Sequence, residues 1–372
     1  MEELQKNIII HGDCLEEMKR IPSNSIDLIF ADPPYWMRVE GVLKRPEGTD
    51  FSGCDDEWDN TFNTNQDYTE FTRQWLTECY RILTKNGSIW VIGGMQCIYT
   101  IGAIMQELGF WFINDVIWHK TNPTPNFMGT RLNNSHETLI WATKDKKSKF
   151  TFHYKTAKQL NTDNISMNLF DSGKRKQMGS VWRFAVCNGN ERLKNAHGEK
   201  LHSTQKPEEL LYRIIALTSN MGDIVFDPFG GTMTTSAVAK KLGRNYLAIE
   251  QKLEYVQAGI KRVNQVVFED NEIARAKFDE KPLKAPMVDM IKAGFFEIGE
   301  RFYLKNSDEF AELTADGKLI YQTQIYDMHT LSAKIKRVKA ERLNGFSWWQ
   351  VERNKIKVSI DDIRENYRQS VR

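Results

Sequence analysis

The residues with the clearest chemical potential follow the first strongly apolar segment of the chain, in the sequence SIDLIFADPPYWM. Residues 26–30 predict a buried strand, and open α/β sheets place their ligands at the carboxyl ends of such strands. Proline lacks a backbone donor but keeps its carbonyl, so Asp32 and the Pro33 carbonyl form a pair of acceptors for an –NH₂ group. Tyr35 supplies a flat face on which a planar base stacks, worth about 1–3 kcal/mol per base. Taken alone, the tetrapeptide fits a plain proline turn capped by an acid equally well.

These groups suit one particular reaction. The exocyclic amino nitrogen of a base is a poor nucleophile because its lone pair is delocalised into the ring. Two acceptors that bind its hydrogens localise the lone pair and orient it toward an electrophilic carbon. The motif therefore favours alkylation of an amino group, with the base held against Tyr35.

A second acid ends a later strand, in the sequence DIVFDPFGGTMTT at residues 223–235. After Asp227 a glycine turn leads into a helix, so that backbone can approach a ligand closely and helix N–H groups face it. Glu250 ends the next strand, where a carboxylate binds ribose hydroxyls in nucleotide-type α/β units. The order of these elements favours a nucleoside-containing cofactor, and a tight turn capped by an acid is the alternative.

The elements that must position these residues alternate along the chain. Short β-branched and aromatic runs separate helical patterns, which predicts an α/β fold with a largely parallel sheet. Strands are expected at 26–30, 88–92, 111–118, 138–142, 224–226 and 246–249. Helices are expected at 68–83, from Lys206 onward, after the second glycine turn, and at 253–266.

The pattern weakens between 144 and 202, where polar and basic residues predict loops that carry binding groups. After 267 the sequence becomes charged, and FDEKPLKAP is typical of a linker. We therefore expect a first domain at 1–270, a linker at 271–284 and a second domain at 285–372, with short strands such as RFYL and KLIYQTQI.

Composition narrows the class of protein. Of the 372 residues 41% are hydrophobic and 27% charged, and the net charge is +2, which is typical of a soluble globular protein. Basic residues are concentrated at 144–206 (14 against five acids) and 331–372 (11 against five), which favours a polyanionic partner. The five scattered cysteines show no metal-ligand spacing and suit a reducing cytosol. The N-terminus shows no secretion signal, and the longest apolar stretch reads as strand, turn and helix rather than a membrane span.

DPPY after a strand, with DPFGGT far downstream, resembles the β-class amino-methyltransferases of DNA, which use S-adenosylmethionine. In that class the catalytic motif precedes the glycine motif, as it does here. The resemblance extends through HGDCLEEM, IWVIG, NPTPNF, HETLIWA and HSTQKPEELLYRII to NGFSWW, so it covers nearly the whole chain. The chain is most similar to the group that holds the cell-cycle-regulated adenine methyltransferases and the GANTC-specific modification methylases. Members of this group carry an added C-terminal DNA-binding domain.

This resemblance implies a fold, a cofactor and partners. The fold would be a doubly wound, mostly parallel, seven-stranded Rossmann-like sheet with a small C-terminal α+β DNA-binding domain. The cofactor would be S-adenosylmethionine, with no metal, and the partner DNA. A homodimer in the cytoplasm is implied, and a cognate restriction endonuclease where the enzyme is one half of a restriction–modification pair.

The resemblance also carries roles onto matching residues. Asp32 and the Pro33 carbonyl would bind the target amino group, Pro34 would shape the loop and Tyr35 would stack on the extruded base. The methionine end of the cofactor would be lined by Asp227, Phe229 and Gly231, and Thr232 would also bind the cofactor. Glu250 would hold its ribose, and Asp13 and Cys14 would meet its adenine. Thr204, Gln205 and Lys206 would close over it.

Two departures from the family pattern stand out in the glycine turn. The family usually reads D-P-F-x-G-x-G, and here Met233 replaces the last glycine. We expect this methionine either to crowd the cofactor pocket or to cover it. Gly230 stands where a phenylalanine is frequent in the family, and a small residue is easily tolerated at this position.

Residues that contact DNA are expected in loops at about 36–60 and 120–206 and in the C-terminal domain. Asparagine and arginine read base edges or hold phosphate, and tryptophan stacks on bases. The candidates in the first domain are Lys44, Arg45, Asn122, Asn126, Arg131 and Asn133. Those in the second are Arg342, Asn344 and Trp348, of a Trp348–Trp349 pair from which only one is expected to reach DNA. An ordinary polar loop and a tryptophan core are the alternatives.

The sequence therefore predicts a site-specific DNA adenine-N6 methyltransferase that extrudes its target base. Cytosine-N4 methylation uses the same geometry, but enzymes of that kind more often begin the motif with serine, so Asp32 favours adenine. A DNA-binding protein that keeps the fold but has lost turnover, with Met233 blocking the cofactor, is the alternative from another class. An RNA methyltransferase fits the C-terminal extension less well.

Overall fold

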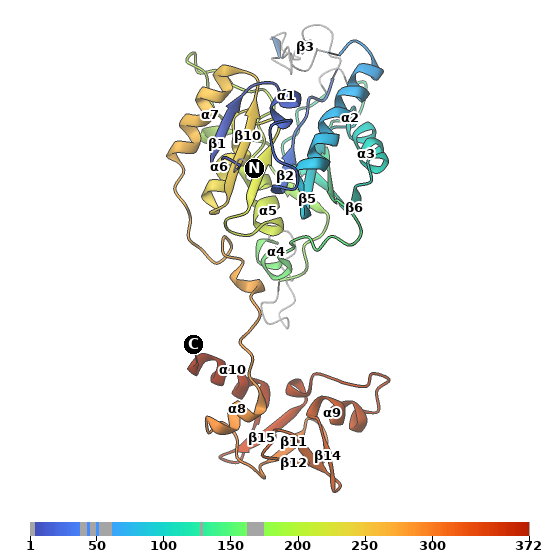
Figure 1. Ribbon diagram of the computed structural model, residues 1–372, viewed down its shortest axis with the longest axis vertical. Helices are drawn as coiled ribbons and strands as arrows, with labels where there is room; N and C mark the ends of the chain where they lie inside the picture. The colour runs from blue at the N-terminus through green and yellow to red at the C-terminus, as the bar shows by residue number, and fades with distance from the viewer. Residues whose placement is uncertain are drawn as a thin grey trace. The chain divides into compact units, whose positions relative to one another are not determined.

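The computed structural model describes residues 4–37, 43–44, 50–51, 62–126, 129–161 and 175–371, with the backbone alone at 43–44 and 50–51. The chain divides into two compact units, Met1–Asp279 and Glu280–Arg372 (Figure 1). The expected linker, 271–284, straddles this division. Its first part belongs to the larger unit, because the Asp279 carboxylate accepts hydrogen bonds from the backbone N–H groups of Lys155 and Thr156.

The larger unit is built on a sheet that has eight strands in the described part of the chain. Its strands, in spatial order, are β1 (Ile8–His11), β10 (Asn245–Glu250), β9 (Ile224–Asp227), β2 (Ile26–Ala31), β5 (Leu83–Gly93), β7 (His136–Thr143), β6 (Trp111–Lys120) and β8 (Val181–Phe184). All neighbours pair in parallel except β7, which is antiparallel to both β5 and β6. A separate two-stranded ladder joins β3 (Leu43–Lys44) to β4 (Asp50–Phe51).

Helices cover both faces of this sheet, which makes the unit doubly wound. They are α1 (Cys14–Met18), α2 (Asn65–Ile82), α3 (Ile98–Glu107), α4 (Tyr154–Leu160), α5 (Glu208–Thr218), α6 (Thr234–Lys241) and α7 (Leu253–Gln265). Side chains of β2 alternate between the faces, as a strand buried on both sides requires. Ile29 belongs to the core formed with α1, α2 and α3, and Leu28 to the core formed with α5 and α6.

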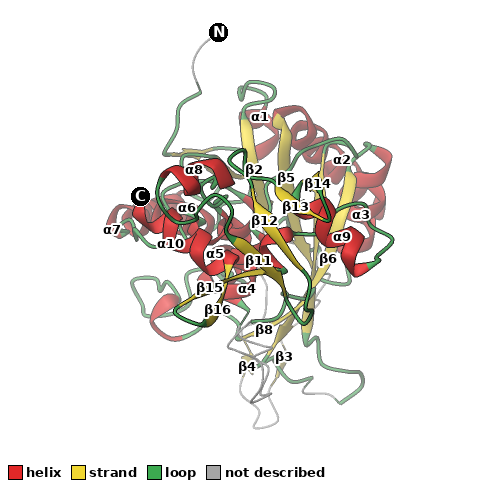
Figure 2. Cartoon of the chain, turned by 90° about the horizontal axis from the view of Figure 1, so that it is seen from below, coloured by secondary structure: helices red, strands yellow, loops and turns green. Residues whose placement is uncertain are grey.

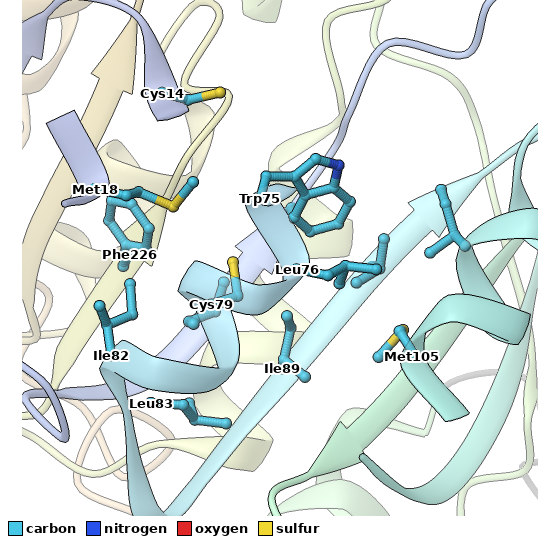
Figure 3. Close-up of a cluster of buried hydrophobic side chains, with 14 of the residues drawn as sticks. Cys14, Met18, Trp75, Leu76, Cys79, Ile82, Leu83, Ile89, Met105 and Phe226 are labelled. Atoms are coloured by element: carbon cyan, nitrogen blue, oxygen red, sulfur yellow. The ribbon is translucent and has the colours of Figure 1, made fainter. Parts of the chain in front are cut away.

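The amphipathic helix α2 shows how the sequence builds one of these faces. Thr64 and Asp67 cap its start reciprocally, each side chain accepting from the other residue's backbone N–H. Trp75 and Cys79, four residues apart, are fully buried in the core cluster that also holds Met18 of α1 and Phe226 of β9 (Figure 3). The expected helix at 68–83 is thus present and begins three residues earlier, at Asn65, directly after its cap Thr64.

The α/β class and the mostly parallel sheet are confirmed, but the implied number of seven strands is wrong. The additional strand β8 lies at the sheet edge within the region 144–202, which was expected to consist of loops. Strand β8 is short, and its buried side chains are only Trp182 and Phe184. Two buried aromatics between exposed neighbours give too short a period-2 signal to stand out in a basic, polar segment.

The smaller unit is a six-stranded antiparallel sheet packed against helices (Figure 2). Its strands are β11 (Arg301–Leu304), β12 (Phe310–Leu313), β13 (Leu319–Tyr321), β14 (Gln324–Tyr326), β15 (Trp349–Arg353) and β16 (Ile356–Ser359), with helices α8 (Met287–Lys292), α9 (Met328–Lys336) and α10 (Ile360–Ser370). The run KLIYQTQI was expected to form a single strand, and it forms a hairpin instead. Gln322 and Thr323 both have positive φ, which is the geometry of a two-residue turn.

Among the described residues, no helix is long and apolar enough to cross a membrane.

Candidate active site

Two Asp-Pro turns lie side by side at one edge of the larger sheet. Strands β2 and β9 are hydrogen-bonded neighbours and run in parallel, with Ile29 opposite Phe226. Asp32 directly follows β2 and Asp227 ends β9, so both carboxylates lie at the carboxyl edge of the sheet. Parallel strands bring the two motifs together although nearly two hundred residues separate them in the sequence.

One cavity of about 570 Å³ connects the two turns. Every residue expected to act in catalysis or cofactor binding lines it: Asp13, Cys14, Asp32, Pro33, Pro34, Tyr35, Thr204, Gln205, Lys206, Asp227, Phe229, Gly231, Thr232 and Glu250. The cavity is also lined by residues that sequence reasoning did not single out, including His202, Lys252 and Tyr255. A cavity of this size is in the range of sites for small ligands and cofactors.

Asp32 is ion-paired with a lysine at the wall of the cavity. Lys206 Nζ lies 2.8 Å from Asp32 Oδ2 and 5.1 Å from the centroid of the Tyr35 ring. Burial raises the pKa of Asp32 above its ordinary value, and the charge of Lys206 opposes that shift. The structure thus brings Lys206, which was expected at the cofactor, to the Asp32 carboxylate.

A second carboxylate, Glu137, completes this network and was not singled out from the sequence. Its Oε2 accepts a hydrogen bond of 2.9 Å from the Tyr35 hydroxyl, and its Oε1 lies 2.6 Å from Lys120 Nζ. Lys206 Nζ is 3.8 Å from Glu137 Oε2. Burial alone acts to raise the pKa of Glu137. The two lysines and the Tyr35 hydroxyl outweigh that effect and hold the pKa below its ordinary value.

The sequence held a signal for Glu137 in the run HETLIWA, where an acid stands at the start of a buried strand. Because β7 is antiparallel, its amino end lies at the same edge of the sheet as the carboxyl ends of the parallel strands. Lys120 ends β6 at that edge, two residues after Trp118, which pairs with Glu137. The strand direction, which the residues alone did not reveal, decides that Glu137 belongs to the site.

Aromatic residues contact the first Asp-Pro turn on the side of α2. The Tyr68 hydroxyl on α2 donates a hydrogen bond of 2.9 Å to the Pro34 carbonyl. Trp36 follows with φ of 51°, in the left-handed region that a bulky residue rarely adopts, and stacks on Tyr68 with 5.7 Å between ring centroids. Its indole N–H donates to the Phe62 carbonyl. These contacts fix the direction in which the chain leaves Tyr35.

Asp227 is held by neutral donors instead of a cation. Its Oδ1 accepts from the Phe229 N–H at 3.0 Å and its Oδ2 from the Thr235 hydroxyl at 2.5 Å. Burial raises the pKa of this carboxyl to about 7, and the two hydrogen bonds only partly oppose the shift. A cationic group in the cavity would stabilise the ionised form, which suits the amino group of an amino acid moiety.

The glycine turn requires Gly231 and positions Glu250. Gly231 has φ of 51°, and its N–H donates to Glu250 Oε2 at 2.8 Å. Glu250 Oε1 accepts from the Lys252 N–H at 2.7 Å. Each carboxylate oxygen has a further lone pair, so Glu250 is fixed in place and still able to accept from ribose hydroxyls.

The expectation that Met233 crowds or covers the cofactor pocket is wrong. Met233 is fully buried in a cluster with Ala237, Ala248 and Val263, and it is not among the residues that line the cavity. Its φ of 60° explains the glycine that the family pattern has at this position. The side chain occupies space that Gly259 on α7 leaves open, because a Cβ there would lie 2.2 Å from Met233 Cγ.

The remaining cavity residues have structural partners of their own. Asp13 caps α1 by accepting from the Leu15 and Glu16 N–H groups. Cys14 is buried, and burial together with the Asp13 charge raises its thiol pKa to about 12, which disfavours the reactive thiolate form. Gln205 accepts from the Leu193 N–H and thereby joins two segments of the loop before α5. The Thr204 N–H donates to His202 Nδ1.

Four DNA candidates of the larger unit lie on the loop between β6 and β7, whose described residues are mostly exposed: Asn122, Asn126, Arg131 and Asn133. Asn126 and Asn133 bind each other, through the Asn126 N–H and Asn133 Oδ1 at 2.8 Å, and the Asn126 side chain donates to the Arg131 carbonyl. Asn122 is different, because its side-chain oxygen accepts from the Val186 N–H. Arg45 and the side chain of Lys44 lie outside the described residues.

The candidates of the smaller unit lie within seven residues of the chain, at 342–348. Arg342 pairs with Asp327 at 3.1 Å, and Asn344 donates to the Ser347 hydroxyl. Trp348 is partly buried, with Lys336 Nζ 4.7 Å from its ring centroid. Trp349 is fully buried and is the core residue of the pair.

Among the described residues, no group of three or more His, Cys, Asp or Glu side chains is placed to hold a metal ion.

The chain is similar to known proteins over nearly its whole length. A family model described as DNA methylase matches residues 26–261. The chain is 47% identical over 361 residues to the type II methyltransferase M.HinfI of Haemophilus influenzae, covering 97% of this chain and 96% of that protein. It is 34% identical over 264 residues to the type II methyltransferase M2.LlaDCHI of Lactococcus lactis subsp. cremoris, covering 71% and 91%. Among solved structures, the PvuII DNA methyltransferase (cytosine-N4-specific) shares the fold, with a TM-score of 0.50 and 22% identity over 74% of this chain and 90% of that one.

Proposed function

We propose that this chain, which belongs to the DNA methylase family, methylates the N6 amino group of an adenine extruded from duplex DNA. The methyl donor of this DNA methyltransferase is S-adenosylmethionine, which supplies an electrophilic methyl group when bound. The resemblance of the sequence to GANTC-specific methylases makes GANTC the proposed recognition site.

The observation that carries the proposal is the single cavity shared by both Asp-Pro turns. A methyl transfer requires the acceptor nitrogen and the donor carbon to be held in contact with the correct orientation. The neighbouring strands β2 and β9 place Asp32 and Asp227 at one edge, so a base bound at the first turn faces a ligand bound at the second.

Asp32 and the Pro33 carbonyl would accept the two hydrogens of the target amino group. The Pro34 carbonyl already accepts from Tyr68, which leaves it a role in shaping the turn. With the hydrogens held, the nitrogen lone pair forms the new N–C bond while the methyl–sulfur bond breaks and its electrons remain on sulfur. The methylated nitrogen then loses a proton to Asp32 or to water. Tyr35 would hold the base by stacking.

The residues around Asp227 fit an amino acid bound next to a nucleoside. Burial raises the pKa of the Asp227 carboxyl to about 7, and the ammonium group would stabilise its ionised form. Glu250, fixed by two backbone N–H groups, would accept from the ribose hydroxyls. Asp13 and Cys14 lie at the end of β1 beside β10, which suits contact with the adenine. Phe229, Thr232, Thr204 and Gln205 would enclose the ligand.

DNA binding would use the exposed loop between β6 and β7, with Asn126, Arg131 and Asn133, and the smaller unit, with Arg342, Asn344 and Trp348. Lys44 and Arg45 would follow the target strand after the catalytic turn. Extrusion of the base is needed because the reacting amino group is inaccessible inside a duplex. A homodimer, a cytoplasmic location, a cognate endonuclease and membership of the β-class belong to the same proposal.

The experiment is to express the chain in cells that lack DNA methylation and to map modified bases by single-molecule sequencing. We expect N6-methyladenine in every GANTC site and in no other sequence context. Modified cytosine would identify the enzyme as an N4 methyltransferase, and modified adenine at another site would overturn GANTC. An Asp32→Ala strain serves as the control and should show no modification.

A further inference from the structure

Lys206 occupies the place that a target base needs. Its ammonium lies 2.8 Å from Asp32 Oδ2, where the amino group must donate, and 5.1 Å from the centroid of the Tyr35 ring, where the base must stack. The side chain is only 6% exposed, so it is confined to this wall of the cavity. An amino group that donates to Asp32 Oδ2 and a base that stacks on this side of Tyr35 would compete with the ammonium for the same two groups.

A second carboxylate lies close enough to the ammonium to pair with it after a small movement. Glu137 Oε2 is 3.8 Å from Lys206 Nζ, and Glu137 itself is held in place by Lys120 at 2.6 Å and the Tyr35 hydroxyl at 2.9 Å. A lysine side chain has four rotatable carbons, so a shift of this size needs only small torsional changes. The Thr204 carbonyl, 3.4 Å from Nζ, lies beside the same path.

We propose that Lys206 is a positioning residue that moves from Asp32 to Glu137 when the target amino group binds. This rests on the proposed function of Asp32 as the acceptor for that amino group. In the absence of a base, the lysine neutralises a buried carboxylate that would otherwise be costly to leave unpaired. When the base enters, the two N–H groups of its amino nitrogen donate to Asp32 and the Pro33 carbonyl in place of the ammonium. Glu137 then pairs with the displaced ammonium.

The exchange gives Glu137 two separable roles, and a double-mutant cycle separates them. Glu137→Gln keeps an acceptor for the Tyr35 hydroxyl but removes the negative charge that receives Lys206. Lys206→Met removes the ammonium that has to be received. We compare single-turnover methylation of a GANTC duplex at saturating S-adenosylmethionine in the four proteins of the cycle, with Lys19→Met, which breaks an exposed 2.8 Å pair with Glu16, as the control.

We expect Glu137→Gln to slow the reaction about 10–100-fold in the presence of Lys206, because the ammonium then remains on Asp32. In the Lys206→Met background the same change should slow it less than threefold further. An equal loss in both backgrounds would overturn the exchange, since it would show that Glu137 acts only by holding Tyr35. Lys19→Met should match the unmodified protein.

If either variant fails to fold, a crystal structure of the unmodified protein with the duplex and sinefungin decides the matter. We expect Lys206 Nζ within hydrogen-bond distance of Glu137 and no longer in contact with Asp32. Lys206 still paired with Asp32 beside an extruded base would contradict the proposal. Failure of the proposed function is distinguishable, because the unmodified protein would then form no N6-methyladenine on the same duplex.

Discussion

The two Asp-Pro turns of the active site begin alike and are held differently. Asp32 directly follows β2 and Asp227 ends the neighbouring parallel strand β9; Asp227 is buried, Asp32 is partly buried, and burial raises the pKa of both. Asp32 is paired with the Lys206 ammonium, whereas the side-chain and backbone donors to Asp227 among the described residues are the neutral groups of Phe229 and Thr235. A carboxylate that already has a cation suits a neutral ligand that displaces it. A carboxylate without a cationic partner suits a ligand that carries a positive charge.

The largest effect should come from removing the acceptor for the target amino group. Asp32→Ala is expected to lower the single-turnover methylation rate about 1,000-fold, because the nitrogen lone pair is then neither localised nor oriented. The dissociation constant for S-adenosylmethionine, measured by calorimetry, should change less than threefold. Asp316→Ala, which removes an exposed carboxylate of the smaller unit, is the control. A fully active Asp32→Ala protein would refute the role of this turn.

Asp227→Asn should mainly weaken cofactor binding and should affect the rate of methyl transfer less. We expect S-adenosylmethionine binding to weaken about 10–100-fold, since the amide lacks the charge that pairs with an ammonium. At saturating cofactor the methylation rate should recover to within tenfold of the unmodified protein. A variant that binds cofactor normally would show that Asp227 does not bind the ammonium.

The pH dependence of cofactor binding should follow Asp227. Its pKa of about 7 means that the carboxyl of the free protein is mostly protonated at pH 6 and mostly ionised at pH 8. Because a cation binds the ionised form, affinity should rise about tenfold over that range, as titration calorimetry can measure. Affinity of the Asp227→Asn protein should be nearly flat. An equal slope in both proteins would assign the titration to another group.

The two acids should also differ in the size of their effect on stability. The pKa of Asp227 is raised, so between about pH 4 and 7 the native state binds more protons than the unfolded state and the free energy of unfolding falls as pH rises. Asp227→Asn should therefore raise the free energy of unfolding of the free protein at pH 8 by roughly 1–2 kcal/mol. The pKa of Asp32 is raised as well, but the charge of Lys206 offsets part of the cost of its ionisation, so Asp32→Asn should raise the free energy of unfolding less. An equal gain in both variants, measured by denaturant unfolding, would mean that the two sites are not held differently.

The smallest effect on cofactor binding is expected at Met233, which lies outside the cavity. Met233→Ala should change the dissociation constant for S-adenosylmethionine less than threefold, while the cavity it leaves destabilises the fold by about 2–3 kcal/mol. Met233→Gly should be slightly more stable than Met233→Ala because glycine adopts φ of 60° freely. A large loss of cofactor affinity in either variant would place this residue at the ligand after all.

The sequence allowed the fold class and the residues that line the cavity to be predicted, because strand-ending acids and glycine turns are local signals. It did not reveal the pairing of Lys206 with Asp32, which depends on how the loop before α5 folds back over β2. It also hid Glu137, whose place depends on the antiparallel direction of β7. Met233 was misplaced for a related reason, since the room that accommodates it comes from Gly259 on another helix.

Asp32 is proposed to direct methylation to the N6 amino group of adenine. Mass spectrometry of nucleosides from a GANTC duplex, after reaction with the full chain and isotopically labelled S-adenosylmethionine, measures this selectivity. We expect labelled N6-methyladenine as the methylated nucleoside, with none formed by Asp32→Ala. Labelled N4-methylcytosine, or no labelled nucleoside at all, would contradict the proposal.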